Sequence, residues 1–262
     1  MKTKSFILIT TIVLLSIPYL VGISSVPFHP DESTQLYTSE DVTVFFKNPT
    51  RLFWNPSVQD ARQTYRLLDA PLSRTVIGLG RTLTSQPAIV SDWNWSKTWA
   101  ENEAAGALPT RQSLWMSRLF SALFFPFALL CMFFAAQSLI GAKAAWSALL
   151  LTALHAYLLL HGRRALSEGL LFLHITFFAW ALFTWKKHPW LLAIPTALAF
   201  SAKYSSIPLI LIGLISMVWP ISQRPWHLRI LDSVRFSILS GLIIFILHPI
   251  FWSDPLHAIP AA

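Results

Sequence analysis

The sequence predicts an all-α polytopic membrane protein with about seven transmembrane helices and one long loop outside the cytoplasm. Of its 262 residues, 54% are hydrophobic and 12% are charged, and the mean hydropathy is +0.54. An average soluble domain carries roughly 25% charged residues, so this chain has too few charges to wet the surface of a globule of its size. Long apolar runs separated by short basic clusters indicate lipid as the solvent.

The first apolar run extends from Phe6 to Ile23 and follows Lys2 and Lys4. A cleaved signal peptide is the alternative interpretation, but no clear A-x-A cleavage site follows the run. The run is long enough to cross a bilayer. We therefore expect residues 1–25 to form a retained first transmembrane helix whose N-terminus is cytoplasmic.

Residues 26–112 form a long polar stretch, which we expect to be an extracytoplasmic loop. It lacks the alternating pattern of β-strands but contains two amphipathic segments, residues 60–68 and 72–83. Such segments can lie flat in the headgroup region, and Trp93, Trp95 and Trp99 would then sit at the interface. The loop is therefore predicted to carry interfacial helices.

Residues 113–262 are predicted to form a transmembrane helical bundle. Their apolar runs cover residues 114–140, 144–160, 170–185, 190–202, 207–219 and 236–247. Several of these runs are shorter than the ~20 residues that a perpendicular span requires. Tilted, broken or partly submerged helices are therefore expected, with one division near Lys203.

The charged residues give the orientation of the predicted spans. The basic residues between runs fall on the same side as Lys2 and Lys4; they are Lys143, Lys186, Lys187, Arg224, Arg229 and Arg235. That distribution satisfies the positive-inside rule. Of the twelve Asp and Glu residues, only Asp232 is predicted to be cytoplasmic. Because the rule is largely blind to acids, their skew indicates function, and we expect a multi-pass cell-membrane protein with an extracytoplasmic site.

The net charge of +8 does not indicate nucleic acid. The basic residues flank apolar runs instead of covering one polar face, so no nucleic-acid partner is predicted. The sequence has no Walker A loop, no G-x-G-x-x-G turn and no H-E-x-x-H motif, which removes the common nucleotide and metalloprotease sites. The single cysteine, Cys131, excludes an internal disulfide and a cysteine-based zinc site. No metal ligands are predicted.

Two adjacent acids, Asp31 and Glu32, follow the first helix in the run His29-Pro30-Asp31-Glu32. A carboxylate at the membrane edge can act as a general base toward an acceptor hydroxyl. The alternative is that these residues cap a helix beginning at Ser33, because acids and proline are both favoured at helix N-termini. Local sequence alone favours the cap.

Several cations lie on the outer side, where the positive-inside rule does not place them; they are Arg118, Arg163, Arg164 and Lys203. Arginine binds phosphate through a planar donor fork, so a phosphate-bearing lipid would explain them. The alternatives are a helix pair between Arg164 and Glu168, and a Lys203 side chain that extends to the headgroups.

Two further motifs carry candidate residues. Asp69 and Arg74 flank a turn at Pro71, where they could share a site or form a solvated local ion pair. His248, at the outer end of the last run, could move a proton or contact a phosphate. A satisfied interfacial side chain is the alternative for His248.

Taken in order along the chain, these motifs resemble the superfamily of protein O-mannosyltransferases and aminoarabinose transferases, the GT-C glycosyltransferases. The motifs are His29-Pro30-Asp31-Glu32, Asp69-Ala70-Pro71-Leu72, Trp93-Asn94-Trp95, Arg118-Leu119-Phe120-Ser121, the run from Arg163 to Glu168, and Ala202-Lys203. The nearest resemblance is to bacterial dolichyl-phosphate-mannose-protein mannosyltransferase-like proteins, and it covers nearly the whole chain. It implies a GT-C-like fold and transfer of a sugar from a polyprenyl phosphate to a protein, lipid or glycan acceptor.

The resemblance also implies roles for the candidates. Asp31, with Glu32 beside it, would be the base or would position the acceptor, and transfer would invert the anomeric carbon. Asp69 and Pro71 stand where the family usually has His-Pro-Pro or Lys-Pro, and Arg74 would substitute there. Other ligands of the lipid phosphate would be Arg118, Arg163, Arg164 and Lys203. Membrane lipid is a further expected partner; no cofactor is implied, and a divalent cation stays open.

Members of the superfamily are commonly longer, so a fragment, a natural short form and an inactive remnant are all open. Two other functions stay open as well. Arg118 and Lys203 would suit the path of a transporter or flippase for a lipid-linked anion, although no inverted repeat is visible. A non-catalytic membrane scaffold is the third interpretation.

Overall fold

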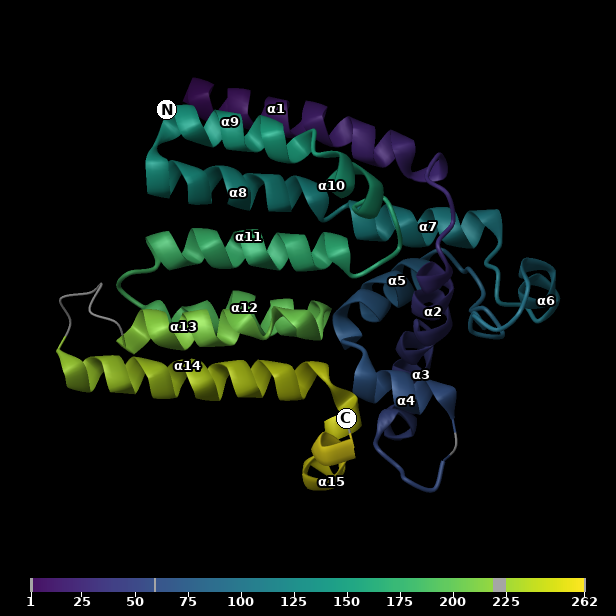
Figure 1. The fold of residues 1–262 in the computed structure, drawn as a ribbon. Helices are drawn as coiled ribbons and strands as arrows, with labels where there is room; N and C mark the ends of the chain where they lie inside the picture. Colours follow the sequence, from purple (N-terminus) through teal and green to yellow (C-terminus); the bar gives the residue numbers. More distant parts are fainter. Residues whose placement is uncertain (1, 59, 219–224, 262) are drawn as a thin grey trace.

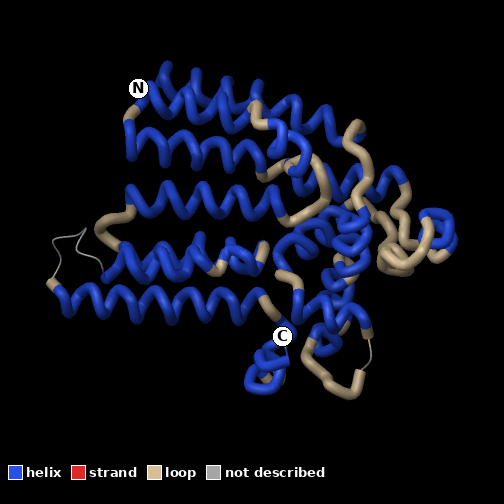
Figure 2. The backbone as a smooth tube through the Cα atoms, in the orientation of Figure 1, coloured by secondary structure: helices blue, strands red, loops and turns tan. Residues whose placement is uncertain are grey.

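The computed structural model describes residues 2–58, 60–218 and 225–261, and within these ranges it is all-helical. Figure 2 draws helices and loops there and no strand. Figure 1 shows a bundle of roughly parallel helices with a group of short helices at one end. The prediction of an all-α fold is thereby confirmed, whereas the number of spans and the GT-C arrangement stay predictions.

The bundle contains the long apolar helices of the chain. They are α1 (Lys2–Val21), α8 (Phe125–Ile140), α9 (Ala142–Ala153), α11 (Glu168–Thr184), α12 (Ala193–Ala202), α13 (Pro208–Val218) and α14 (Trp226–Leu247). Within the described ranges, three apolar helical stretches are long enough to cross a membrane: Ser5–Ser24, Arg111–Ile140 and Trp226–Leu247. The apolar stretches Glu168–Thr184, Pro189–Ala202 and Tyr204–Val218 are shorter. These helices are those expected of a membrane-associated protein.

Several helix boundaries differ from the predicted runs. The run 114–140 contains two helices, α7 (Arg111–Ala122) and α8, and the run 144–160 divides into α9 and α10 (Ala156–His161), where His155 is extended (φ −68°, ψ 120°). The last run, predicted from residue 236, begins at Trp226, because charged side chains near a helix end can reach polar surroundings while the backbone stays helical. The division near Lys203 is confirmed, since this residue ends α12 in an extended conformation. Arg224 lies outside the described residues.

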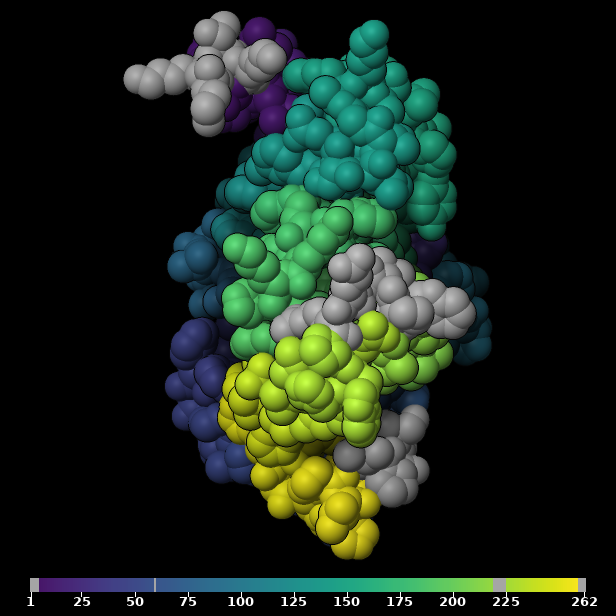
Figure 3. Space-filling model, turned by 90° about the vertical axis from the view of Figure 1, so that its left-hand side faces the viewer, coloured from purple at the N-terminus to yellow at the C-terminus, as the bar shows by residue number. Residues whose placement is uncertain are grey.

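Two apolar cores hold the bundle together. In the first, the Tyr19 ring stacks on Phe125 with centroids 3.4 Å apart, and its hydroxyl donates to the carbonyl of Ala153 at 3.2 Å, which fastens α1 to α8 and α9. The second core surrounds Phe236 and joins α11 to α14. Figure 3 views the bundle from the end opposite the short helices and shows it layered from α1 to α14. Its outer surface exposes apolar side chains, among them Phe6, Val13, Leu151, Leu211 and Leu242.

Short helices at one end of the bundle form the segment that was predicted to be an extracytoplasmic loop. They are α2 (Pro30–Thr38), α3 (Asp41–Lys47), α4 (Ala61–Leu68), α5 (Pro71–Leu83) and α6 (Trp99–Ala104). The two predicted amphipathic segments correspond to α4 and α5 to within one residue. In Figure 1, α6 lies at the end of the molecule farthest from the bundle helices. We call these five helices, together with the turns between them, the lobe.

The first lobe helix begins at Pro30 and not at Ser33. His29 caps it: its ring Nδ1 accepts from the N–H of Asp31 at 3.2 Å, and its own N–H donates to the Glu32 carboxylate at 3.0 Å. Such a reciprocal cap satisfies backbone donors that the first helical turn leaves free. The capping interpretation of this motif is therefore confirmed, with the helix starting three residues earlier than predicted.

Turns and single-turn 3₁₀ helices connect these elements. The 3₁₀ helices are η1 (Gly22–Ser24), η2 (Pro49–Leu52), η3 (Pro189–Leu192), η4 (Tyr204–Ser206) and η5 (Pro249–Phe251). The last helix, α15 (Pro255–Ala261), follows η5 and packs beside α4. A small apolar cluster around Leu67 and Ile250 thus joins the lobe to the end of α14.

Gly78 marks a close approach between α5 and α3. A Cβ there would overlap the carbonyl oxygen of Ser39 and the side chain of Val42. We expect Gly78→Ala to lower the free energy of unfolding by about 1–3 kcal/mol, the usual effect of overpacking. The matched control is Gly241→Ala, where a Cβ meets no atom within 4 Å. Thermal unfolding in detergent checks both variants, and equal Tm values would contradict the close approach.

Candidate functional site

A buried ion pair between Glu32 and Arg118 lies where the lobe meets the bundle. Nε and Nη2 of Arg118 donate to the two carboxylate oxygens of Glu32, each at 2.7 Å. Both side chains are almost completely excluded from solvent. Two parallel charge-assisted hydrogen bonds are the strongest arrangement that an arginine and a carboxylate form. The pair joins α2 to α7, which are 86 residues apart in sequence.

Every side of this pair is hydrogen-bonded. Nη1 of Arg118 donates to the carbonyl oxygens of Ile23 and Val26, both at 2.8 Å. The Glu32 carboxylate also accepts from the backbone N–H of Ala165 at 2.9 Å. Both carboxylate oxygens of Glu32 and all three guanidinium nitrogens of Arg118 therefore have partners within the protein. A catalytic role for Glu32 and a phosphate-binding role for Arg118 stay predictions.

Asp31 is the accessible member of the acid pair. Its side chain is 58% exposed, and its carboxylate lies 3.6 Å from Nδ1 of His29. Asp31 directly precedes Glu32, and Arg164 directly precedes Ala165. The hydrogen bond from the N–H of Ala165 to the carboxylate of Glu32 therefore joins their sequence neighbours. The structure therefore brings Asp31 and Arg164 to the same end of the molecule, although they are 133 residues apart.

Arg164 is buried and has no charged partner among the residues that the structure describes. It is 9% exposed, and its Nε is shielded from solvent with no hydrogen-bond acceptor in the described part of the chain. The predicted helix pair with Glu168 does not form, because α11 begins at Glu168 and leaves Arg164 in the preceding turn. Buried charges in proteins are normally paired. The desolvation cost of this shielded donor is not offset by a hydrogen bond to any described residue.

Lys203 takes the carboxylate that was predicted to pair with Arg164. Its Nζ lies 2.7 Å from Oε1 of Glu168, and the lysine side chain is 40% exposed. Burial lowers the pKa of Lys203, but the hydrogen bond and charge of Glu168 outweigh it and leave the pKa above its usual value. The ammonium group of Lys203 is thus held by Glu168, while the lysine side chain stays partly exposed to solvent.

The pKa of His161 is affected by the charged groups around it. Burial lowers its pKa, the charges of Arg164, His29 and Lys203 lower it further, and only Glu168 acts in the opposite direction. Its Nδ1 is shielded from solvent and has no hydrogen-bond partner among the described residues. The neutral imidazole is therefore favoured near pH 7, and the end of α10 lies in the same electrostatic environment as the α2 cap and Lys203.

Arg74 and Asp69, from the second outer motif, are both bound within the lobe. Arg74 is buried and donates to the carbonyl oxygens of Tyr65 and Asp69 at 3.1 and 3.2 Å. The carboxylate of Asp69 instead accepts from Nε2 of Gln35 at 2.7 Å. The predicted local ion pair between the two side chains is therefore replaced by a contact of Arg74 with the backbone of Asp69.

Arg163 and His248 both lie against aromatic side chains. The guanidinium of Arg163 lies 5.9 Å from the centre of the Tyr19 ring, at the end of the first helix. His248 is buried, with Nδ1 2.7 Å from the carbonyl oxygen of Ile244 and its ring stacked beside Tyr204. The interpretation of His248 as a packed side chain at a helix end fits this placement.

Asp92 is a polar residue of the lobe that sequence analysis missed. It accepts hydrogen bonds from Thr34, at 2.8 Å, and from the hydroxyl of Tyr65. Thr34 follows Asp31 by one helical turn, so Asp92 lies along the same helix face. Burial and the bond to Asp92 raise the pKa of the Tyr65 hydroxyl. A lone aspartate in a loop carries no motif, and its neighbour Trp93 was the only signal.

The candidate site therefore rests on its own geometry. No family model, no curated protein and no solved structure matches this chain. Over the ranges that the structure covers, no group of three or more His, Cys, Asp or Glu residues is arranged to hold a metal ion. The arrangement offers an exposed carboxylate at the same end of the molecule as a buried guanidinium whose Nε has no acceptor among the described residues and a lysine paired with Glu168.

The two ion pairs predict very different effects on stability. Arg118→Ala leaves Glu32 buried and unpaired, so we expect it to lower the free energy of unfolding by about 3–5 kcal/mol. Lys203→Ala breaks a pair that faces solvent, where the expected loss is about 0–1 kcal/mol. Thermal unfolding of the purified proteins measures both. Similar shifts in Tm for the two variants would show that the buried pair does not hold the lobe.

Proposed function

We propose that this protein is a membrane glycosyltransferase that moves a sugar from a polyprenyl phosphate to an acceptor outside the cytoplasm. The observation that carries the proposal is Arg164, a buried guanidinium without a protein anion, next to the Ala165–Glu32 hydrogen bond that also fixes Asp31. Transfer from a lipid phosphate needs a cation for the departing phosphate and a base for the acceptor. Arg164 and Asp31 supply these two groups.

Asp31 is the base in this proposal. Its exposed carboxylate takes the proton of an acceptor hydroxyl, and the oxygen then attacks the anomeric carbon of the donor sugar. The bond from that carbon to the phosphate oxygen breaks, and its electron pair leaves with the lipid phosphate. A single displacement of this kind inverts the anomeric carbon.

Arg164 and Lys203 stabilise the phosphate as it departs. Fixed donors aimed at developing charge are effective because they need no reorganisation during the reaction. Glu168 keeps Lys203 in position, and Arg163 adds a second guanidinium in the same turn, beside Tyr19. Glu32 and Arg118 act through position, since they hold the α2 turn against residues 164 and 165.

The proposal includes the GT-C arrangement, seven spans and a cytoplasmic N-terminus. The lobe and the 161–168 turn lie at the same end of the bundle, in agreement with the acid-rich outer face that the charge distribution predicts. A transporter or flippase for a lipid-linked anion would also use Arg164. The exposed carboxylate of Asp31 favours the transferase, because anion transport gives it no role.

Activity tests the two central residues. We expect purified protein to transfer sugar from one member of a panel of labelled polyprenyl-phosphate sugars. Asp31→Asn should reduce kcat by about 10²-fold or more, the usual contribution of a general base. Arg164→Ala should reduce kcat by about 10²–10³-fold, as does loss of one donor to developing negative charge.

The matched control is Glu103→Gln, an exposed carboxylate of α6 in the same lobe, which should retain full activity. The Tm of each variant separates loss of chemistry from loss of fold. Wild-type activity of Asp31→Asn would remove this carboxylate from the mechanism, and movement of the lipid across vesicles without sugar transfer would favour a transporter.

Sidedness provides an independent test. In a Cys131→Ser background, Ser96→Cys lies in the lobe and Lys187→Cys lies between α11 and α12, at the opposite end of the bundle. We expect a membrane-impermeant maleimide to label the first in intact cells and the second only after permeabilisation. Labelling of both from one side would contradict the proposed topology.

A further inference from the structure

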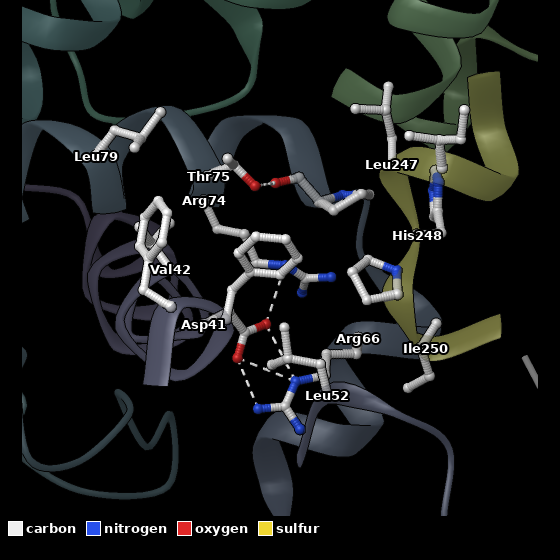
Figure 4. Close-up of a pocket in the computed structure, with 15 residues that line it drawn as sticks. Asp41, Val42, Leu52, Arg66, Arg74, Thr75, Leu79, Leu247, His248 and Ile250 are labelled. Atoms are coloured by element: carbon white, nitrogen blue, oxygen red, sulfur yellow. Dashed lines mark hydrogen bonds and ion pairs between the residues drawn. The ribbon is translucent and has the colours of Figure 1, made fainter. Parts of the chain in front are cut away.

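A cavity lies between α3, α5 and the end of α14. Its volume is about 290 Å³, and apolar side chains form most of its wall. Figure 4 shows Val42 and Leu79 on one side of the cavity and Leu247 and Ile250 on the other. None of the three helices carries Asp31, Arg164 or Lys203, whereas Arg74 and His248 both line the cavity.

Three charged side chains also line the cavity. Nε and Nη2 of Arg66 donate to the Asp41 carboxylate at 3.0 and 2.6 Å, and Nε of Arg74 lies 3.5 Å from the same carboxylate (Figure 4). Both arginines are buried, and the Asp41 side chain is 12% exposed. Two guanidinium groups thus share one carboxylate, and the cluster keeps one net positive charge. A buried net charge of this kind favours an anion.

The cavity wall continues into the exposed apolar surface of the molecule. Phe46, Leu79 and Ile246 line the cavity and are themselves exposed. Ile246 follows the exposed Leu242 by one turn of α14, and both lie on a helix long and apolar enough to cross a membrane. The molecule that meets this opening is therefore a membrane lipid.

We propose that this cavity binds an anionic phospholipid of the surrounding bilayer. One hydrocarbon chain lies against the apolar walls, which removes apolar surface from water, and the phosphate lies near Arg66 and Arg74. Basic pockets beside transmembrane helices bind anionic headgroups in this way. A polyprenyl phosphate has similar chemistry, but bulk phospholipid surrounds the opening at far higher density, so mass action favours it. The bound lipid joins the lobe to the last bundle helix.

Native mass spectrometry of the full chain in detergent tests the proposal. The probes are phosphatidylglycerol, phosphatidylcholine and an undecaprenyl phosphate, each added over a range of concentrations. We expect phosphatidylglycerol to bind about ten-fold more tightly than phosphatidylcholine. Ile246→Trp places a larger side chain at the opening and should weaken phosphatidylglycerol binding by about ten-fold.

Leu242→Trp is the matched control, since it adds the same side chain on the same helix face one turn away from the cavity. It should bind phosphatidylglycerol as the wild type does, and unchanged Tm values show that both variants fold. Equal binding of phosphatidylglycerol and phosphatidylcholine would overturn the proposal. Unchanged binding by Ile246→Trp, or a preference for undecaprenyl phosphate, would overturn it as well.

Discussion

The buried pair of Glu32 and Arg118 is the interaction on which the rest of the structure depends. Removing a charge from water costs several kcal/mol, and only close geometry with further hydrogen bonds offsets that cost. Here the two charged groups meet each other, the end of the first helix and the turn before α11. Separation of α2 from α7 would leave both charges buried and unpaired, and movement of the other two segments would remove hydrogen bonds from them. The position of the α2 start, with Asp31 and Glu32, is therefore fixed relative to the turn that carries Arg163 and Arg164.

Arg118 and Arg164 show how the same residue type serves two purposes. Both lie on the outer side of the predicted topology, and the sequence predicts the same phosphate-binding role for each. The structure surrounds Arg118 with a carboxylate and backbone carbonyls, whereas it buries Arg164 without an acceptor at Nε. The hydrogen bonds of Arg118 offset the cost of burying its charge, whereas the free Nε of Arg164 leaves part of that cost without compensation. The difference comes from the partners that the fold supplies.

Local patterns predicted the elements of the fold, and long-range pairing determined the site. Amphipathic periodicity placed α4 and α5, and the Pro30-Asp31-Glu32 motif indicated a helix start, although the cap is His29 and the helix begins three residues earlier than predicted. The partners of Glu32 and Glu168 lie 86 and 35 residues away, and nothing in the local sequence specifies them. The helical spacing of Arg164 and Glu168 suggested a pair that does not form, because spacing is informative only where both residues are helical. Sequence analysis did not predict the pair of Asp41 and Arg66, because the two residues are 25 positions apart and no local pattern links them.

The candidate site and the lipid cavity share one continuous framework. Gln35 of α2, the helix that carries Asp31, donates to Asp69; the backbone of Asp69 accepts from Arg74, and Arg74 lies beside Asp41 at the cavity wall. Each step is a direct polar contact between buried or half-buried groups, so α2 and the cavity cannot shift independently without breaking one of them. A lipid phosphate near Arg74 therefore lies beside the guanidinium that holds the backbone of Asp69. Asp69 in turn accepts from Gln35, on the helix that carries Asp31. The geometry of the proposed base thus depends on the lipid-facing edge of the lobe as well as on the buried pair.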